Sequence, residues 1–366
     1  MSRGAIALLA LISALPLAAQ RWQMQYFYDQ NKSSMVIADL KFPSARRGIA
    51  VGYIQRGTRQ EPTSLVTSDG GAHWRTVAVK ELPYSLFFLN EATGWMVTSK
   101  GIWRTAETGN TWTKLGKTPT PVVRVYFIDE KTGWAVGPRK AVYQTADGGV
   151  HWSKLEAAAE PPGDPLYSAY TWVAFASPKL GLISGFNQPP RRTFGEERPV
   201  WLDPEAAARR RELPHLNYTL FTRDGGKTWH ANSSSLFGQT TKVYFAADGN
   251  GLGLVEFGNA ADWASEIYKI DWHTGNSTTV YRDHHFSVSD MWIAPGGTAY
   301  LAGDIAPGRV RDLVPGRVQV LVSKDFKDWK AMPVDYRASA TRVVLAVAGD
   351  DMWLATDGGM ILKLVK

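Results

Sequence analysis

Short runs of apolar residues alternate along this chain with turns rich in glycine, aspartate and asparagine. In residues 122–159 the runs VRVYFI, GWAVG and AVYQT are followed by a fourth that starts at a tryptophan, HWSKLE. Such short runs, rich in valine, tyrosine, phenylalanine and tryptophan, are typical of β-strands. Amphipathic stretches of ten or more residues, which a helical repeat would need, are missing from the sequence. The pattern therefore predicts units of four antiparallel strands.

The four-run unit recurs at a period near 40 residues. A short motif, TADGGVHW, precedes the fourth run; it returns as TSDGGAHW, TAETGNTW and TRDGGKTW, and in worn form as SKDFKDW. The four full copies end at Trp74, Trp112, Trp152 and Trp229, which are 38, 40 and 77 residues apart. Four antiparallel strands at this period are typical of a β-propeller blade.

Seven such units fit the chain. They cover residues 35–79, 84–119, 122–159, 171–235, 241–282, 286–334 and 341–366. The last unit holds only three runs, and residues 21–29 supply the fourth, because Trp22 stands where the fourth run of other units begins. The sequence thus predicts an all-β fold, a single seven-bladed β-propeller over residues 21–366 with an insert at 187–217 in blade 4. The N-terminal strand closes the ring by pairing in the last blade.

The repeated motif has the residues of a structural turn. The Asp147 carboxylate can accept hydrogen bonds from backbone N–H groups of its own turn, and Gly149 suits a position with positive φ. Trp152 is expected to bury its ring between blades. Copies spread around a ring cannot converge on one substrate, so we expect no catalytic residue among them. The motif residues taken as structural are Asp69, Trp74, Trp112, Asp147, Trp152, Asp224, Trp229, Asp325 and Trp329.

The first 20 residues have the features of a secretory signal peptide. Arg3 supplies a basic start, residues 5–15 are apolar, and small residues surround the expected cleavage site near Ala19. No other stretch is long and apolar enough to predict a transmembrane helix. The chain has no cysteine, which excludes disulfides and a lipid-modified cysteine. We therefore expect an exported protein, periplasmic or extracellular, that depends on its core for stability.

Long insertions fall between the second and third strands of four predicted units, and these loops are rich in arginine. Loops on one end of a rigid scaffold are favoured binding positions, and arginine pairs well with carboxylates. The sequence therefore predicts a basic partner-binding surface, with Trp201 as an aromatic anchor. Its expected residues are Arg56, Arg59, Arg139, Lys140, Arg191, Arg192, Arg198, Trp201, Arg209, Arg210, Arg211, Arg309, Arg311 and Arg317.

The charge of the chain agrees with an acidic partner. The formal net charge is +7, and the partner we expect is an acidic or membrane-protein segment bound by a monomer. The seven histidines are scattered, and the glycines follow the turns rather than a phosphate-binding loop. We therefore expect no metal and no cofactor. Nucleic acid is an unsuitable partner for an exported protein.

The motif S/T-x-D-x-G-x-x-W resembles the Asp box of bacterial neuraminidase repeats, which occurs in sialidases, large glucan hydrolases and sortilin-type receptors. The longer unit, GWAVG followed by VYQTADGGVHW, is similar to the photosystem II assembly and stability factor and its relatives in non-photosynthetic bacteria. The resemblance covers nearly the whole chain after residue 20. It implies an exported seven-bladed propeller that binds a membrane-protein partner and has no enzyme activity.

Two other functions fit a propeller of this kind. A sialidase-type glycoside hydrolase needs three arginines, a Tyr–Glu nucleophile pair and an aspartate. Arginine and tyrosine are available, but FPSARRGIA at 42–50 does not match the early motif of that family. An extracytoplasmic polysaccharide-binding propeller would use exposed members of the 15 tryptophans.

Overall fold

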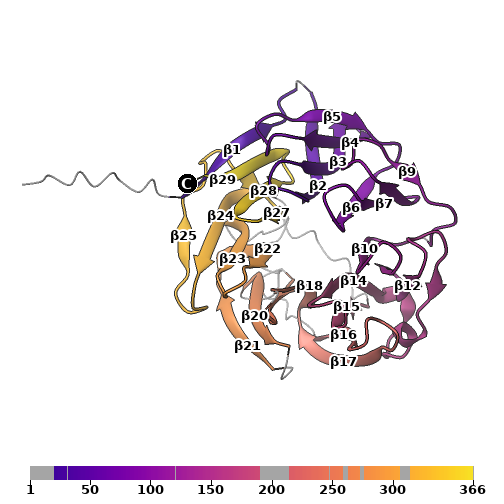
Figure 1. Cartoon of the computed structure of the whole chain (residues 1–366). Helices are drawn as coiled ribbons and strands as arrows, with labels where there is room; N and C mark the ends of the chain where they lie inside the picture. Colours follow the sequence, from indigo (N-terminus) through magenta and orange to yellow (C-terminus); the bar gives the residue numbers. More distant parts are fainter. Residues whose placement is uncertain are drawn as a thin grey trace, which may run out of the picture.

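The computed structural model describes residues 20–30, 32–119, 121–189, 214–246, 248–258, 263–272, 276–305 and 314–365. These residues form seven antiparallel sheets arranged in a ring (Figure 1). Six sheets have four strands, and the seventh gains a short fifth strand, β26 (Ser339–Ala340). The predicted seven-bladed β-propeller is therefore confirmed.

The strands occupy four positions in each blade, and consecutive strands along the chain are neighbours in the sheet. The innermost strands are β2 (Ser34–Lys41), β6 (Pro83–Phe88), β10 (Arg124–Phe127), β14 (Ser168–Phe175), β18 (Gln239–Phe245), β22 (Phe286–Ile293) and β27 (Val343–Ala348). The second strands are β3 (Gly48–Arg56), β7 (Gly94–Thr98), β11 (Gly133–Gly137), β15 (Gly181–Asn187), β19 (Asn250–Glu256), β23 (Ala299–Ile305) and β28 (Asp351–Thr356).

The outer half of each blade completes the sheet. The third strands are β4 (Arg59–Thr67), β8 (Gly101–Thr105), β12 (Ala141–Thr145), β16 (Pro214–Thr222), β20 (Ser265–Asp271), β24 (Gly316–Ser323) and β29 (Met360–Val365). The outermost strands are β5 (Arg75–Ala78), β9 (Thr113–Lys114), β13 (Ser153–Lys154), β17 (His230–Phe237), β21 (Ser277–Arg282), β25 (Lys330–Met332) and β1 (Arg21–Phe27).

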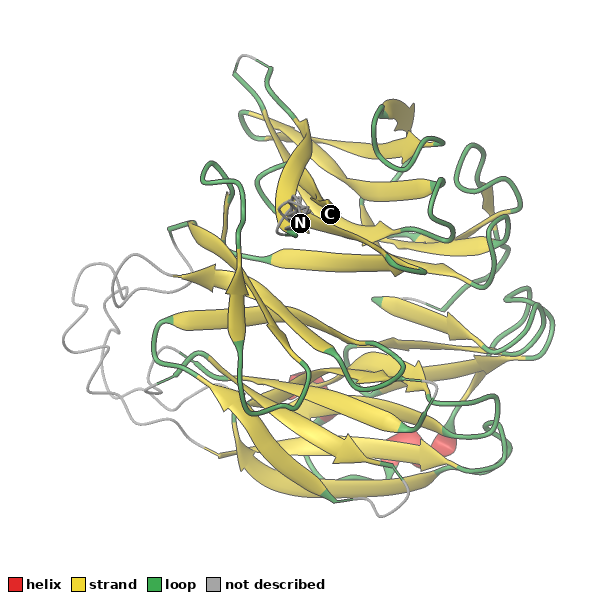
Figure 2. Cartoon of the chain, turned by 60° about the vertical axis from the view of Figure 1, so that its left-hand side comes forward, coloured by secondary structure: helices red, strands yellow, loops and turns green. Residues whose placement is uncertain are grey.

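Helical structure is sparse in the described part of the chain. Two 3₁₀ turns, η1 (Glu156–Ala159) and η2 (Pro165–Tyr167), connect the third blade to the fourth, and Figure 2 shows strands in nearly all other elements. Over the same residues, no helix has the length and apolar character needed to cross a membrane.

The ring closes in the last blade through its outermost strand. β1 pairs antiparallel with β29 from Arg21 opposite Val365 to Phe27 opposite Met360. The Trp22 side chain is 1% exposed, and its backbone N–H donates to the Pro333 carbonyl of the preceding blade at 2.8 Å. The predicted closure by the N-terminal strand is therefore confirmed.

The second strands form the most buried layer because a neighbouring blade covers each face. Every residue of β7 and β11 is buried, whereas β9 and β13 are exposed. The glycine that begins a second strand lies under a phenylalanine from the end of the inner strand. A Cβ atom on Gly133 would lie 2.4 Å from the Phe127 ring, so this position excludes larger residues.

The tryptophan that ends the repeated motif is less buried than we predicted. Of the motif tryptophans, Trp229 is 9% exposed, but Trp152 is only half-buried because its strand lies at the rim of the blade. The fully buried tryptophans include Trp95 and Trp134 of the second strands, at 0% exposure. Trp134 stacks on Phe175 of the next blade, with ring centroids 4.6 Å apart. This buried aromatic contact between blades is therefore made by the second strand, two strand positions further in than the predicted contact of Trp152.

Candidate functional site

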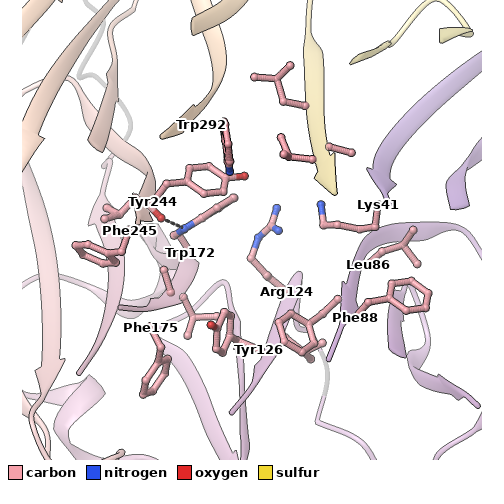
Figure 3. A pocket seen from close by; sticks show the side chains of 18 of the residues that line it. Lys41, Leu86, Phe88, Arg124, Tyr126, Trp172, Phe175, Tyr244, Phe245 and Trp292 are labelled. Carbon is pink, nitrogen blue, oxygen red and sulfur yellow. Dashed lines mark hydrogen bonds between the residues drawn. The ribbon is translucent and has the colours of Figure 1, made fainter. Parts of the chain in front are cut away.

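A cavity of about 360 Å³ lies on the axis of the ring, lined by residues of all seven inner strands or the turns that follow them. Its walls are aromatic and aliphatic, and Lys41 and Arg124 are the only charged residues among the described residues that line it (Figure 3). The lining residues come from the later part of most inner strands. The cavity therefore lies toward the end of the channel where the first strand of a blade turns into the second.

Seven residues hold the same register position on the inner strands, next to this cavity. Each is opposite the equivalent position of the second strand, as Arg124 is opposite Val136 and Lys242 opposite Leu254. We name this set the inner belt. It consists of Asp39, Ser85, Arg124, Trp172, Lys242, Asp290 and Val344.

The first carboxylate of the inner belt joins two adjacent blades. Asp39 is 3% exposed, and its Oδ2 accepts a hydrogen bond from the Leu86 N–H of the next inner strand at 2.8 Å. Its Oδ1 accepts from the Leu40 N–H at 2.9 Å and from Lys41 Nζ at 2.6 Å. Burial raises the pKa of Asp39, but the charges of Lys41 and Arg124 and the Leu86 N–H together hold that pKa below its usual value.

The second carboxylate repeats this arrangement between blades 6 and 7. Asp290 is 1% exposed, and its Oδ2 accepts from the Leu345 N–H of the next inner strand at 2.8 Å. Its Oδ1 accepts from the Met291 N–H at 3.0 Å and lies 2.9 Å from Lys242 Nζ. Burial lowers the pKa of Lys242, while Asp290 acts in the opposite direction. Each buried carboxylate is therefore held by two backbone donors and one lysine.

Arg124 is the remaining cation of this cluster. Its guanidinium lies over the Trp172 ring, with Cζ 4.0 Å from the ring centroid. Trp172 is fixed in turn, because its Nε1–H donates to the Val243 carbonyl at 2.6 Å. Among the described residues, no hydrogen-bond partner lies within reach of the buried Arg124 Nε. Figure 3 shows the guanidinium in the middle of the cavity, between Lys41 and Trp172.

The repeated motif has the predicted turn geometry. Thr145 Oγ1 donates to Asp147 Oδ1 at 2.9 Å and accepts from the Gly149 N–H at 3.0 Å. Asp147 Oδ1 also accepts from the His151 N–H at 2.9 Å, and Gly149 has a φ of 95°. The turns at 67–74 and 222–229 make the same bonds. All of these carboxylates lie in connections between third and fourth strands, apart from the axial cavity.

Replacement of the Asp147 carboxylate is expected to lower the melting temperature and to make the melting temperature less sensitive to low pH. Hydrogen bonds from His151 hold the pKa of Asp147 at about 2, below its value of about 3.9 in unfolded chains. A carboxylate whose pKa is lower in the folded state than in the unfolded state stabilises the folded protein above about pH 4. This stabilisation is lost as the pH falls toward 2. We expect Asp147→Asn to melt a few degrees lower than wild type at pH 7, with a smaller difference at pH 2.

Thermal unfolding at pH 7, 4 and 2 measures this difference. Asp350→Asn is the matched control, because the structure gives its carboxylate no hydrogen bond or ion pair with a described residue. Equal effects of the two substitutions at every pH would contradict the assigned role of Asp147.

The described members of the predicted basic surface lie in the connections between second and third strands or at the strand ends beside them. Arg56 and Arg59 face each other across the β3–β4 turn, and both pair with Glu61, at 3.3 Å and 3.6 Å. Arg139 and Arg317 are exposed. Lys140 is different, because its side chain is 6% exposed and Nζ donates to the Pro161 carbonyl. Nine members lie outside the described residues: Arg191, Arg192, Arg198, Trp201, Arg209, Arg210, Arg211, Arg309 and Arg311.

The sequence prediction did not include the axial residues. One signal was present, because a charged residue interrupts an apolar run at the same place in several units, as in VVRVYF, TTKVYF and VSDMWI. These residues are Arg124, Lys242 and Asp290 of the inner belt. Among the described residues, no group of three or more histidines, aspartates or glutamates could hold a metal ion.

Comparison with known proteins shows that this chain has the same fold as several solved propellers. No protein-family model matches the sequence, and no curated protein matches it. The structure of YCF48 bound to a D1 peptide has a TM-score of 0.59 and 16% identity, over 94% of this chain and 100% of that chain. YCF48 from Cyanidioschyzon merolae has a TM-score of 0.57 and 13% identity, over 94% and 98%.

A hydrolase has a comparable fold. The GH74 xyloglucanase from Xanthomonas campestris has a TM-score of 0.58 and 12% identity, over 94% of this chain and 53% of that chain. At such identities the likeness shows the fold alone, because propellers of one architecture carry different functions. The likeness to YCF48 agrees with the fold that the sequence resemblance implied.

Proposed function

We propose that this protein is an exported, non-catalytic β-propeller that binds a protein partner through the end of the ring formed by the connections between second and third strands. We name this end the B–C face. The observation that carries the proposal is the uneven length of these connections. They span only 99–100, 138–140 and 357–359 in three blades, but 188–213, 257–264 and 306–315 in blades 4, 5 and 6.

Blade 1 enlarges the same end in another way. β3 and β4 continue as nine-residue strands that bring Arg56 and Arg59 to the tip of their hairpin, whereas β7 and β8 have five residues each. By contrast, the turns between third and fourth strands of blades 1, 3 and 4 repeat one compact design. A rigid ring with enlarged, arginine-rich connections at one end is typical of a binding scaffold.

The comparisons and the cavity support binding over catalysis. One structurally similar propeller, YCF48, is bound to a peptide. Among the described residues, no aspartate or glutamate lines the axial cavity, and the carboxylates of Asp39 and Asp290 beside it are occupied by backbone donors and lysines. A glycoside hydrolase needs two available carboxylates, so this cavity is a poor candidate for that chemistry.

Export is supported by the sequence of the first 20 residues, which lie almost wholly outside the described part of the chain. The basic start, the apolar run of residues 5–15 and the absence of cysteine suit a secreted, disulfide-free protein. Appearance of the chain, shortened near Ala19, in the periplasm or the medium is the expected result of cell fractionation. Retention of the uncut chain in the cytoplasm would overturn this part of the proposal.

Charge removal on the B–C face tests the binding surface. We expect a variant with Arg191, Arg192, Arg209, Arg210 and Arg211 changed to glutamine to lose most binding to proteins captured from cell-envelope extracts, with little change in melting temperature. Exposed charges contribute within about 1 kcal/mol per pair to stability. Capture by wild type should also weaken with salt, because the Debye length is about 8 Å at physiological ionic strength and shorter above it.

The control removes the same charge from the opposite end of the ring. Five exposed lysines serve this purpose: Lys131, Lys154, Lys179, Lys227 and Lys324. Their change to glutamine should leave capture intact. Equal loss in both variants, or in neither, would show that the B–C face is not the docking surface. Hydrolysis of a glycan by the purified chain would instead support the hydrolase alternative.

A further inference from the structure

We propose that the axial cavity is a second binding site, which takes a carboxylate attached to a flat apolar group, with Arg124 as the residue that binds the carboxylate. This site lies toward the turns between first and second strands, at the opposite end of the ring from the B–C face. It does not depend on the partner binding proposed above.

The inner belt and the cavity lining together hold more cations than carboxylates. Lys41 and Arg124 line the cavity, and Lys242 lies beside it in the inner belt. The two carboxylates of the belt are each paired with a lysine, Asp39 with Lys41 and Asp290 with Lys242. Arg124 has no ion pair with a described residue. Although its charge also acts on Asp39, the cluster keeps an excess of positive charge in a half-buried site, where an anion is stabilised more strongly than in water.

The Arg124 side chain is held in a binding conformation. Trp172 supports one face of the guanidinium at 4.0 Å, and the Trp172 ring is itself fixed by its bond to the Val243 carbonyl. The edge of the guanidinium, with its N–H donors, remains directed into the cavity (Figure 3). A guanidinium edge binds a carboxylate through two parallel hydrogen bonds, and pre-orientation reduces the entropy lost on binding.

The walls of the cavity suit a ring attached to the carboxylate. Tyr126, Phe175, Tyr244, Phe245 and Trp292 are among the residues that line the cavity, and Figure 3 shows Trp172, Tyr244 and Trp292 on one side of the Arg124 head group. A cavity of about 360 Å³ lies within the range of about 300–1,000 Å³ that is usual for small-ligand sites, near its lower limit. A ligand with a single aromatic ring and one carboxylate fits this volume and this chemistry.

Titration of the full chain with phenylacetate tests the site. We expect saturable binding, followed by calorimetry or tryptophan fluorescence, and at least tenfold weaker binding of phenylacetamide, which has the same shape without the charge. Absence of phenylacetate binding at millimolar concentration, or equal affinity for the amide, would overturn the proposal.

Substitution of Arg124 distinguishes binding at this site from nonspecific binding of phenylacetate elsewhere on the protein. Arg124→Gln should weaken phenylacetate binding at least tenfold, and Arg124→Lys should restore only part of it, because lysine keeps the charge without the planar fork. Lys131→Gln removes an exposed charge outside the cavity and should bind as wild type does. The melting temperature of each variant confirms that it is folded. Unchanged affinity in a folded Arg124→Gln variant would overturn the assignment.

A second arm distinguishes the source of the carboxylate. A capped peptide that contains adjacent aspartate and phenylalanine residues presents the same chemistry as part of a protein. Tighter binding of the free acid, lost in Arg124→Gln, assigns the site to a small molecule. Tighter binding of the peptide, lost in the same variant, assigns it to an acidic protein segment. Peptide binding that is unaffected by Arg124→Gln contradicts a carboxylate site in the cavity.

Discussion

Deletion of residues 21–29 is expected to lower the melting temperature by about 10 °C or more. This deletion removes β1, the outermost strand of the last blade, together with Trp22, which is 1% exposed. Loss of a buried tryptophan alone costs about 3–5 kcal/mol, and each kcal/mol corresponds to about 2–4 °C for a domain of a few hundred residues. The deletion also breaks the pairing of β1 with β29 and leaves that strand with an open edge.

Differential scanning calorimetry on the deleted and full chains measures the effect. Trp22→Ala in the full chain separates the contribution of the side chain from that of the strand. Its melting temperature should lie between those of the deleted chain and the full chain. Phe27→Ala is the matched control, because Phe27 lies on the same strand but is 50% exposed. A deleted chain that melts with the full chain would refute closure by β1.

Trp134→Ala is expected to cost about 3–5 kcal/mol of unfolding free energy. The Trp134 side chain is 0% exposed and lies between blades 3 and 4. It stacks on Phe175 and meets Trp229 edge to face, with centroids 5.8 Å apart in the second pair. Removal of the indole leaves a cavity between two sheets whose backbones are held by their own hydrogen bonds, so the site cannot collapse fully.

Urea unfolding followed by circular dichroism measures this cost as a lower transition midpoint. Trp152→Ala is the matched control, since it removes the same group from a half-buried position in the same blade. We expect it to cost clearly less than Trp134→Ala. Equal costs would mean that the motif tryptophans stabilise the blade junction as much as the buried layer does.

The fold could be predicted from the sequence because its signals are local. Each blade is coded by four apolar runs and a turn motif within about 40 residues, so the unit predicted at 84–119 corresponds to strands from Pro83 to Lys114. The burial of individual tryptophans was harder to predict. Repetition shows that Trp152 recurs, but its exposure depends on whether a neighbouring blade covers the rim, and the sequence pattern does not contain that information.

The axial cavity could not be predicted in the same way, because its residues come from seven separate strands. Asp39 and Arg124 are single charges in apolar runs, and each alone suggests only an ordinary half-exposed strand position. The role of Asp39 depends on the Leu86 N–H of another blade, 47 residues further along the chain. Only the closed ring brings the two lysine–carboxylate pairs and the unpaired arginine around one axis.

The closure of the ring also determines at which stage of synthesis the propeller can complete its folding. Arg21 pairs with Val365, although nearly the whole described chain lies between them. Blades 1 to 6 can each form from a continuous segment, but the last blade needs residues from both ends of that chain. Until the last blade forms, the apolar residues that pack between it and the first blade, which include Met35 and Trp353, stay exposed. A ribosome that stalls before the last blade is made would therefore release a nearly complete propeller with exposed apolar residues on blade 1. These residues can associate with other incomplete chains.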